Sequence, residues 1–123
     1  NYSMGQFSVG YGETLHAPAI AMGGAAATDV VQHYENSGYS IGFAVNDALS
    51  ISYTEENSEK KVKQKSVVHA ITRSDVEMEI VTIDLAYTVG GMTLSLSNSE
   101  AQNDSYTTGD DTTETIAAIS LAF

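Results

Sequence analysis

The chain has 123 residues, no cysteine and a formal net charge of −11, from 16 acidic and 5 basic side chains. The absence of cysteine excludes disulfides and thiolate chemistry, and the acidic balance argues against nucleic acid as a partner because phosphate contacts need lysine and arginine. Hydrophobic residues make up 42% of the chain, yet no apolar run approaches the ~20 residues that a membrane helix requires. Any role in a membrane must therefore use strands.

Apolar and small polar residues alternate through most of the chain. Between Val81 and Val89, for example, an apolar residue occupies every odd position. A period of two predicts strands with one apolar face, and a helical period fits none of these segments. We expect strands at roughly 6–13, 34–45, 48–56, 76–89, 92–100 and 114–123. Residues 1–5 are expected to be the tail of an earlier strand.

The connections between these strands come in two sizes. Short turns are expected at about 4–5, 46–47 and 90–91, where Met4-Gly5, Asn46-Asp47 and Gly90-Gly91 suit two-residue hairpin loops that require positive φ. Long polar connections are expected at about 14–33, 57–75 and 101–113. Short turns on one side and long connections on the other predict an all-β, antiparallel up-and-down meander within one domain, residues 1–123.

The face opposite the apolar residues carries small, uncharged side chains with one acidic exception. A solvated sheet surface would instead carry lysine, glutamate and arginine. In a soluble sandwich the apolar residues point inward, whereas in a transmembrane β-barrel they meet lipid and the polar face lines the lumen. The residue types favour the barrel. The predicted pore-lining residues are Ser50, Ser52, Thr82, Asp84, Thr93, Ser95 and Ser120.

Aromatic residues are expected at two levels along the strands. Tyr2, Phe43, Tyr87 and Phe123 lie near the short turns, and Tyr11, Tyr34, Tyr39, Tyr53 and Tyr106 lie toward the long connections. Two aromatic levels around an aliphatic band are typical of membrane interfaces, where the short turns would be periplasmic and the long loops extracellular. Ordinary β-propensity is the alternative explanation.

Six strands cannot close a spanning barrel, because single-chain bacterial barrels have at least ~8 strands. With about 43 residues per hairpin, a 16-stranded barrel would need ~340 residues, so the chain is expected to be the C-terminal part of one, about six strands. Short chains that assemble into one barrel are the alternative. The sequence at Asn1 has no signal-peptide pattern, so an exported protein should carry one upstream.

The final residues, Ile119-Ser120-Leu121-Ala122-Phe123, place a terminal Phe after apolar residues at every second position. They resemble the C-terminal strand of Gram-negative outer-membrane proteins, and the resemblance implies an assembly signal at Ile119, Leu121 and Phe123 that the barrel-assembly machinery recognises. The segments Tyr39–Tyr53 and Ala86–Leu94 are similar to hairpins of general porins, particularly the alphaproteobacterial type. Ala117 departs from the aromatic residue often found there.

This resemblance implies an integral protein of the cell outer membrane, a homotrimer of water-filled channels for passive diffusion of small hydrophilic solutes and ions. It also implies contacts with the lipid bilayer and lipopolysaccharide, and a constriction loop upstream of these residues. No cofactor is expected. The rival functions are a surface adhesion or structural barrel that acts through its long loops, and a soluble secreted β-domain that binds ligands. No catalytic constellation points to an enzyme.

Charged residues refine this interpretation. Asp84 is expected to face the lumen, because a charge toward lipid costs up to a few kcal/mol, and to attract cations there. Glu77 and Glu79 are out of phase with the apolar positions from Val81 onward, so we expect either a β-bulge near Ile80–Val81 or emergence above the lipid.

Every basic residue of the chain lies in one predicted loop: Lys60, Lys61, Lys63, Lys65 and Arg73. This cluster either binds lipopolysaccharide phosphates or is simply solvated. The three histidines, His16, His33 and His69, show no metal-ligand spacing. Nor does the acidic loop with Asp104, Asp110 and Asp111 match a known calcium loop.

Overall fold

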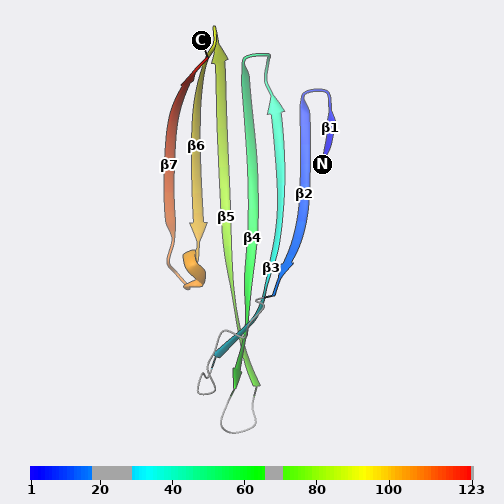
Figure 1. The fold of residues 1–123 in the computed structure, drawn as a ribbon, viewed down its shortest axis with the longest axis vertical. Coiled ribbons are helices and arrows are strands. Elements are labelled where there is room, and N and C mark those ends of the chain that lie inside the picture. The colour runs from blue at the N-terminus through cyan, green and yellow to red at the C-terminus, as the bar shows by residue number, and fades with distance from the viewer. Residues whose placement is uncertain (18–28, 66–70, 123) are drawn as a thin grey trace.

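The computed structural model describes residues 1–17, 29–65 and 71–122. They form one antiparallel sheet of seven strands in chain order, so the all-β, up-and-down meander is confirmed. The strands lie side by side in a single curved layer (Figure 1). They are β1 Tyr2–Met4, β2 Phe7–His16, β3 Asp29–Ala44, β4 Leu49–Lys65, β5 Ile71–Val89, β6 Met92–Gln102 and β7 Thr112–Leu121, with a 3₁₀ turn, η1 Asp104–Tyr106, before β7. The predicted tail of an earlier strand is β1.

Two of the three short turns use glycine as expected. Gly90 and Gly91 both have positive φ, 54° and 80°, which is the pattern of a type I′ hairpin between β5 and β6. The first turn is shifted by one residue from its predicted position. Met4 still pairs with Phe7, so the turn residues are Gly5 and Gln6, and Gly5 supplies the positive φ of 61°.

The predicted two-residue turn at Asn46-Asp47 is wrong. Residues 45–48 connect β3 to β4, and neither Asn46 nor Asp47 has positive φ. The Asn46 side chain accounts for this four-residue connection, because its Oδ1 accepts hydrogen bonds from the backbone N–H of Ala48 (2.8 Å) and Leu49 (2.9 Å). Asparagine side chains stabilise turns in this way without a left-handed backbone.

The predicted long loop at 57–75 is also wrong over most of its length. β4 continues to Lys65 and β5 begins at Ile71, with one register from Leu49↔Tyr87 to Lys65↔Ile71. Similarly, β2 extends to His16 and β3 begins at Asp29, within the predicted loop 14–33. Backbone ladder hydrogen bonds do not depend on side-chain polarity, so charged segments that give no alternation signal still pair as strands.

The polarity of the two sheet faces switches within a regular strand. Both β4–β5 and β5–β6 pair without a shift through Ile80 and Val81, so the predicted bulge there is wrong. A register shift occurs instead between Val31 and His33, in the pairing of β3 with β4. Because the register is unbroken, Ile80 shares a face with Asp84, whereas Glu79 shares the opposite face with Val81.

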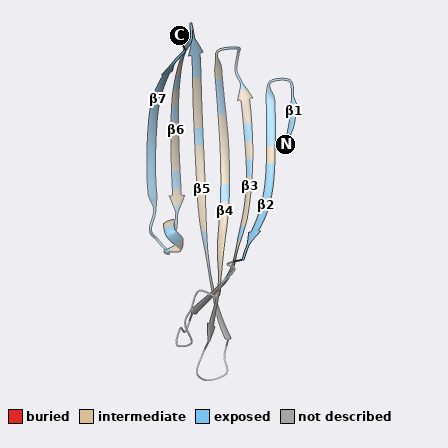
Figure 2. Ribbon diagram, in the orientation of Figure 1, coloured by how far each residue is buried: buried red, intermediate tan, exposed pale blue. Residues whose placement is uncertain are grey.

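The sheet has no hydrophobic core. No residue of the described part of the chain is buried, and no second layer covers either face (Figure 2). Ile41, Leu94 and Leu121 are 46%, 40% and 64% exposed. A soluble domain packs its apolar sheet face against another layer. This apolar face must therefore be covered by something outside these residues.

The sheet is open, with β1 at one edge and β7 at the other. Beyond the three pairs that β2 makes with β1, Gly10–His16 have no strand partner on that side within the described ranges, where β7 also pairs with β6 alone. Free backbone edges of this length are normally paired or covered in proteins. No helix among the described residues has the length and apolar character needed to cross a membrane.

Candidate functional site

The structure gathers the predicted pore-lining residues on one face, which we call the polar face. Ser52 pairs with Asp84, Ser50 and Ser95 both pair with Ala86, and Thr93 pairs with Ser120. Hydroxyl groups hydrogen bond across neighbouring strands, as in Thr82 Oγ1 with Ser99 Oγ at 2.8 Å and Thr88 Oγ1 with Thr93 Oγ1 at 2.9 Å. The shared face follows from the register, and pore lining itself stays a prediction.

Asp84 lies in a hollow of about 350 Å³ near the short-turn end of the polar face. Ser52 Oγ donates a hydrogen bond of 3.4 Å to Asp84 Oδ2. No ion pair joins Asp84 to any basic side chain that the structure describes. The surrounding residues are small, including Ser8, Gly42 and Ala86. The carboxylate therefore faces open space and adds negative charge to this part of the face.

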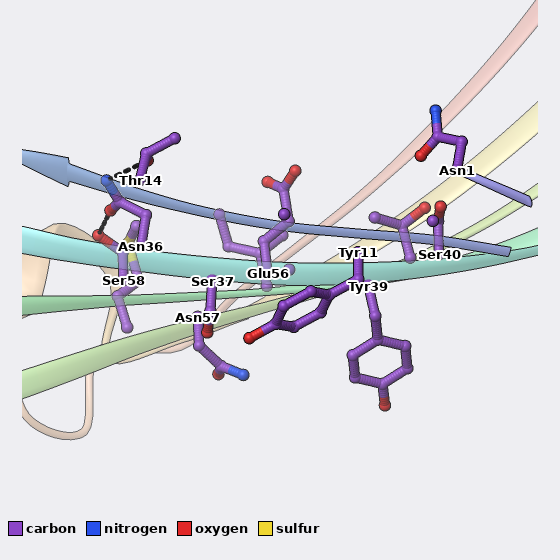
Figure 3. Close-up of a pocket in the computed structure, with 16 residues that line it drawn as sticks. Asn1, Tyr11, Thr14, Asn36, Ser37, Tyr39, Ser40, Glu56, Asn57 and Ser58 are labelled. Atoms are coloured by element: carbon purple, nitrogen blue, oxygen red, sulfur yellow. Dashed lines mark hydrogen bonds between the residues drawn. The ribbon is translucent and has the colours of Figure 1, made fainter.

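A larger hollow of about 580 Å³ occupies the polar face farther from the short turns. Gly10, Gly12 and Gly38 leave its floor without side chains, and Glu56 is the carboxylate that lines it. Figure 3 shows the alternation directly, with Thr14, Glu56 and Asn1 on one side of the strands and Tyr11, Tyr39 and Asn57 on the other.

A hydrogen-bonded row crosses three strands at the distal end of this hollow. Asn36 Nδ2 donates to Thr14 Oγ1 at 3.2 Å, and Ser58 Oγ donates to Asn36 Oδ1 at 2.5 Å (Figure 3). The three residues are register partners on β2, β3 and β4. Tyr106, from the β6–β7 connection, joins the row through its hydroxyl, 2.7 Å from Ser58 Oγ. No local pattern in the sequence predicted this contact.

Two of the tyrosines expected at the membrane interface lie on the polar side instead. The ring of Tyr34 is 5.5 Å from that of Tyr106, and Tyr34 pairs with His16 and Lys60 in the register. Their assignment to an interfacial level is therefore wrong. The reason is that the period of two puts Tyr34 on the even-numbered, polar face of β3, and the connection folds Tyr106 back onto it.

The opposite face carries an apolar band that runs obliquely across the sheet. One register row joins Phe7, Phe43, Ile51, Leu85, Leu96 and Ala117. On β2 this row is the edge of the band nearest the short turns, because the next residues on this face, Val9 and Tyr11, extend the band away from those turns. On β6 the same row is the distal edge, the one farthest from the short turns, because the next residue on this face in that direction is the polar Asn98. Both edges of the band are thus four residues nearer the short turns on β6 than on β2. The distal edge changes mainly between β5 and β6, because Val81 on β5 still shares the register row of Tyr39 and Tyr11.

The offset of the band from the register rows corresponds to a tilt of the strands relative to the band. Averaged over the four strand pairs from β2 to β6, the offset is one residue per strand. With about 3.3 Å per residue and about 4.8 Å between strands, this average corresponds to a tilt of about 30–35°. The tilt of strands in closed barrels is typically about 35–45°. On β5 the band extends from Val81 to Val89, about 26 Å along the strand or about 22 Å in height once tilted.

Tyrosines mark the distal edge of the band on three neighbouring strands. Tyr11, Tyr39 and Tyr53 share the apolar face, with the rings of Tyr39 and Tyr53 6.0 Å apart. Each hydroxyl is turned toward the charged residues beyond the band: Tyr11 donates to Glu13, and both Tyr39 and Tyr53 donate to Glu55. An apolar ring with a polar tip suits a boundary between apolar and aqueous surroundings.

Beyond the tyrosines the same side of the sheet becomes acidic. Glu13, Glu35, Glu59 and Glu77 line a hollow of about 370 Å³ there. Lys61 bridges part of this charge, because its Nζ donates to Glu59 and lies 3.5 Å from Asp75 Oδ2. The hydrogen bond to Glu59 raises the pKa of Lys61 above its ordinary value. The ammonium group is therefore charged at neutral pH.

The predicted basic cluster does not form one loop patch. Lys60, Lys61, Lys63 and Lys65 lie on β4, and Arg73 lies on β5. Lys60 contacts the Tyr106 ring on the polar face, whereas Lys61 pairs with acids on the other side. Alternation along a strand separates neighbouring lysines in this way. The side chains of Lys63, Lys65 and Arg73 lie outside the described residues.

The acidic loop and the histidines are the remaining candidate residues. In the acidic loop, Asp104 Oδ2 accepts from Thr112 Oγ1 and Asp111 Oδ1 accepts from the Asn103 backbone N–H, so these carboxylates close the loop. His33 is 2.9 Å from Glu35, and His69 is outside the described residues. No group of three or more potential metal ligands occurs in the part of the chain that the structure describes.

The predicted assembly residues fall at the sheet edge. Ile119 and Leu121 are exposed on the apolar side of β7, where they pair with Leu94 and Met92, and Phe123 lies outside the described residues. No protein-family model matches the chain, and neither a curated protein nor a solved structure matches it. Inference about function therefore rests on the two faces of the sheet.

Proposed function

We propose that this chain is part of an outer-membrane porin that forms a water-filled channel for passive diffusion of small hydrophilic solutes and ions. The observation that carries the proposal is the oblique apolar band opposite a hollowed polar face that contains Asp84. A flat membrane that meets tilted strands would produce such a slanted band, because its edges follow the bilayer and not the register rows.

The exposed apolar face favours hydrocarbon as its surroundings. A soluble sheet would require a second apolar layer, and none is present among the described residues. Lipid would cover the aliphatic side chains between the tyrosine level and the short turns. The acidic residues beyond Tyr11, Tyr39 and Tyr53 would then lie in water. The polarity switch between Ile80 and Val81 on an unbroken β5 is accounted for by emergence of this strand from the bilayer.

Closure of the sheet completes the proposal. Unpaired backbone at the edges of β2 and β7 cannot face hydrocarbon, so further strands must join both edges in a membrane. These strands come from the same polypeptide or from further copies. A 16-stranded barrel, a homotrimer, an outer-membrane location with lipopolysaccharide contacts, and assembly through Ile119, Leu121 and Phe123 are the finer proposals that the general-porin resemblance adds.

Conductance measurements test the transport function. We expect the detergent-purified protein to produce large, ohmic single-channel steps in planar bilayers. An adhesion or structural barrel with a plugged or narrow lumen would produce none, so the absence of such steps contradicts the porin proposal. That rival is favoured by one feature, the extension of β4 and β5 well beyond the ends of β2 and β6 (Figure 1).

Single cysteines test the proposed faces, because the chain has no native cysteine. We would introduce Leu94→Cys and Ser95→Cys, which are adjacent on β6 but on opposite faces. After labelling with a fluorophore in liposomes, Leu94→Cys should be quenched by brominated lipids and Ser95→Cys by aqueous iodide. Iodide quenching at Leu94→Cys, or bromolipid quenching at Ser95→Cys, contradicts the assignment.

A further inference from the structure

The connection between β6 and β7 is fastened against the sheet and does not project from it. Asn103 makes the attachment: its Nδ2 donates to the backbone carbonyl of Glu77 at 2.9 Å, and its Oδ1 accepts from the backbone N–H of Gly109 at 2.9 Å. The Asn103 N–H also donates to Asp111 Oδ1 at 3.1 Å. One side chain thus ties both ends of the connection to β5.

The backbone of this connection adopts an unfavourable conformation. Asn103, Ser105 and Tyr106 have φ values of 52°, 55° and 59°, although none of them is glycine. Asparagine tolerates the left-handed region, but a bulky residue such as tyrosine rarely adopts it. Strain of this kind persists only where surrounding contacts enforce it, and it concentrates at functional positions.

The contacts that hold Tyr106 lie on the polar face. Its hydroxyl is 2.7 Å from Ser58 Oγ, its ring is 5.5 Å from that of Tyr34, and Lys60 Nζ is 4.9 Å from the ring centroid. Cations are attracted to the face of an aromatic ring at this distance. Tyr106 therefore covers the distal end of the polar face, next to the larger hollow.

Lys60 differs in charge from the rest of this face. Among the strand residues whose side chains are described, the acids on this face are Glu56 on β4, Asp84 on β5 and Glu114 on β7. Among the residues whose side chains are described, Lys60 is the lysine on the polar face, and no ion pair is formed by it. A solute that approached the hollow from the long connections would meet this positive charge and the Tyr106 ring before it reached Glu56 and Asp84.

We propose that Tyr106 and Lys60 form a restriction at the long-connection end of the pore and determine which solutes enter. The Tyr106 ring limits the cross-section, and the Lys60 ammonium group opposes the entry of cations that Glu56 and Asp84 attract. Pore diameter and the charges that line a pore are the two properties that set such selectivity. This inference rests on the proposed channel function.

Two variants and two matched controls test the restriction in the complete protein reconstituted in liposomes and bilayers. Tyr106→Ala should raise the swelling rate with large neutral sugars several-fold relative to small ones, and Tyr106→Phe, which keeps the ring, should stay close to wild type. Lys60→Gln should shift the reversal potential in a KCl gradient toward higher cation preference. Tyr11→Ala and Lys61→Gln remove the same groups from the opposite side and should change neither readout.

The outcomes separate this inference from the channel proposal. The restriction alone is overturned if the wild type passes sugars but Tyr106→Ala leaves the ratio of large-sugar to small-sugar swelling rates unchanged. It is also overturned if Tyr11→Ala changes that ratio as much as Tyr106→Ala does. An unchanged reversal potential in Lys60→Gln overturns the role of the lysine. If the wild-type protein passes neither ions nor sugars, the proposed function fails and this inference fails with it.

Discussion

Neighbouring residues on one strand experience different surroundings. Leu85 is the central apolar residue of β5, between Val81 and Val89, and Ala86 beside it lines the hollow around Asp84. A cation on the lipid face of a barrel near the bilayer midplane costs about 2–4 kcal/mol, whereas a lumen substitution costs little. This difference between faces is the property that most directly distinguishes a lipid-facing band from a generic apolar surface.

We therefore expect Leu85→Arg to lower the free energy of unfolding by about 2–4 kcal/mol and Ala86→Arg to lower it by less than about 1 kcal/mol. Equilibrium unfolding in denaturant, with the protein in liposomes, measures both. Equal losses in the two variants would contradict the assignment of the apolar face to lipid.

Asp84 supports a second prediction at this scale. Its carboxylate has one hydrogen-bond donor, Ser52, and no described basic partner, so its charge acts on the open polar face. Asp84→Asn should lower the cation-to-anion permeability ratio, read from the reversal potential in a salt gradient. Asp47→Asn, in the exposed β3–β4 connection, removes the same charge and should leave the ratio unchanged. An unaltered ratio in Asp84→Asn would argue for a purely structural aspartate.

At the scale of single elements, the hairpins depend on their turn residues. Gly91 has a φ of 80°, and an added Cβ would also lie 3.0 Å from the carbonyl oxygen of Ala122. Gly12 on β2 has no positive φ and has open space around an added Cβ. The two glycines therefore differ in what a methyl group would disturb, although both lie in or beside strands.

Gly91→Ala is expected to lower the free energy of unfolding by about 1–2 kcal/mol, because an L-residue in the left-handed region costs about that much. Gly12→Ala should be neutral or slightly stabilising, since alanine restricts the unfolded chain more than glycine does. Denaturant titration of the two variants side by side checks the difference. A Gly91→Ala variant as stable as wild type would mean that the β5–β6 turn adopts another conformation.

Sequence patterns predicted the apolar parts of the strands well and their polar outer parts poorly. The strands between Leu49 and Tyr53 and between Val81 and Val89 were predictable because one apolar face produces a period of two. The outer parts of β4 and β5, around Glu59 and Asp75, were not, because both of their faces are polar and only the backbone ladder makes them strands. The prediction of the turn at Asn46 was wrong because side-chain hydrogen bonds of Asn46 stabilise a four-residue connection that needs no positive φ.

At the scale of the whole molecule, the offset of the apolar band sets a measurable angle. The band lies four residues nearer the short turns on β6 than on β2, and this average offset corresponds to strands tilted by about 30–35° relative to the band. Polarised infrared spectroscopy of oriented membranes should report a strand tilt of about 30–45° for the protein. Strands that lie in the membrane plane, or that show no preferred orientation, would be incompatible with a spanning barrel.

By itself, the sequence determined which residues share a face, because the direction of a strand side chain depends only on its position along the strand. For this reason the shared face of Ser50, Asp84 and Ser120 could be predicted from the alternation, whereas their lining of a pore stays a proposal. Only the tertiary structure decided the slant of the apolar band and the position of Tyr106 against Ser58 and Lys60. The slant depends on the register of every strand pair, and Tyr106 meets a residue 48 positions away through a connection whose conformation no local pattern specifies.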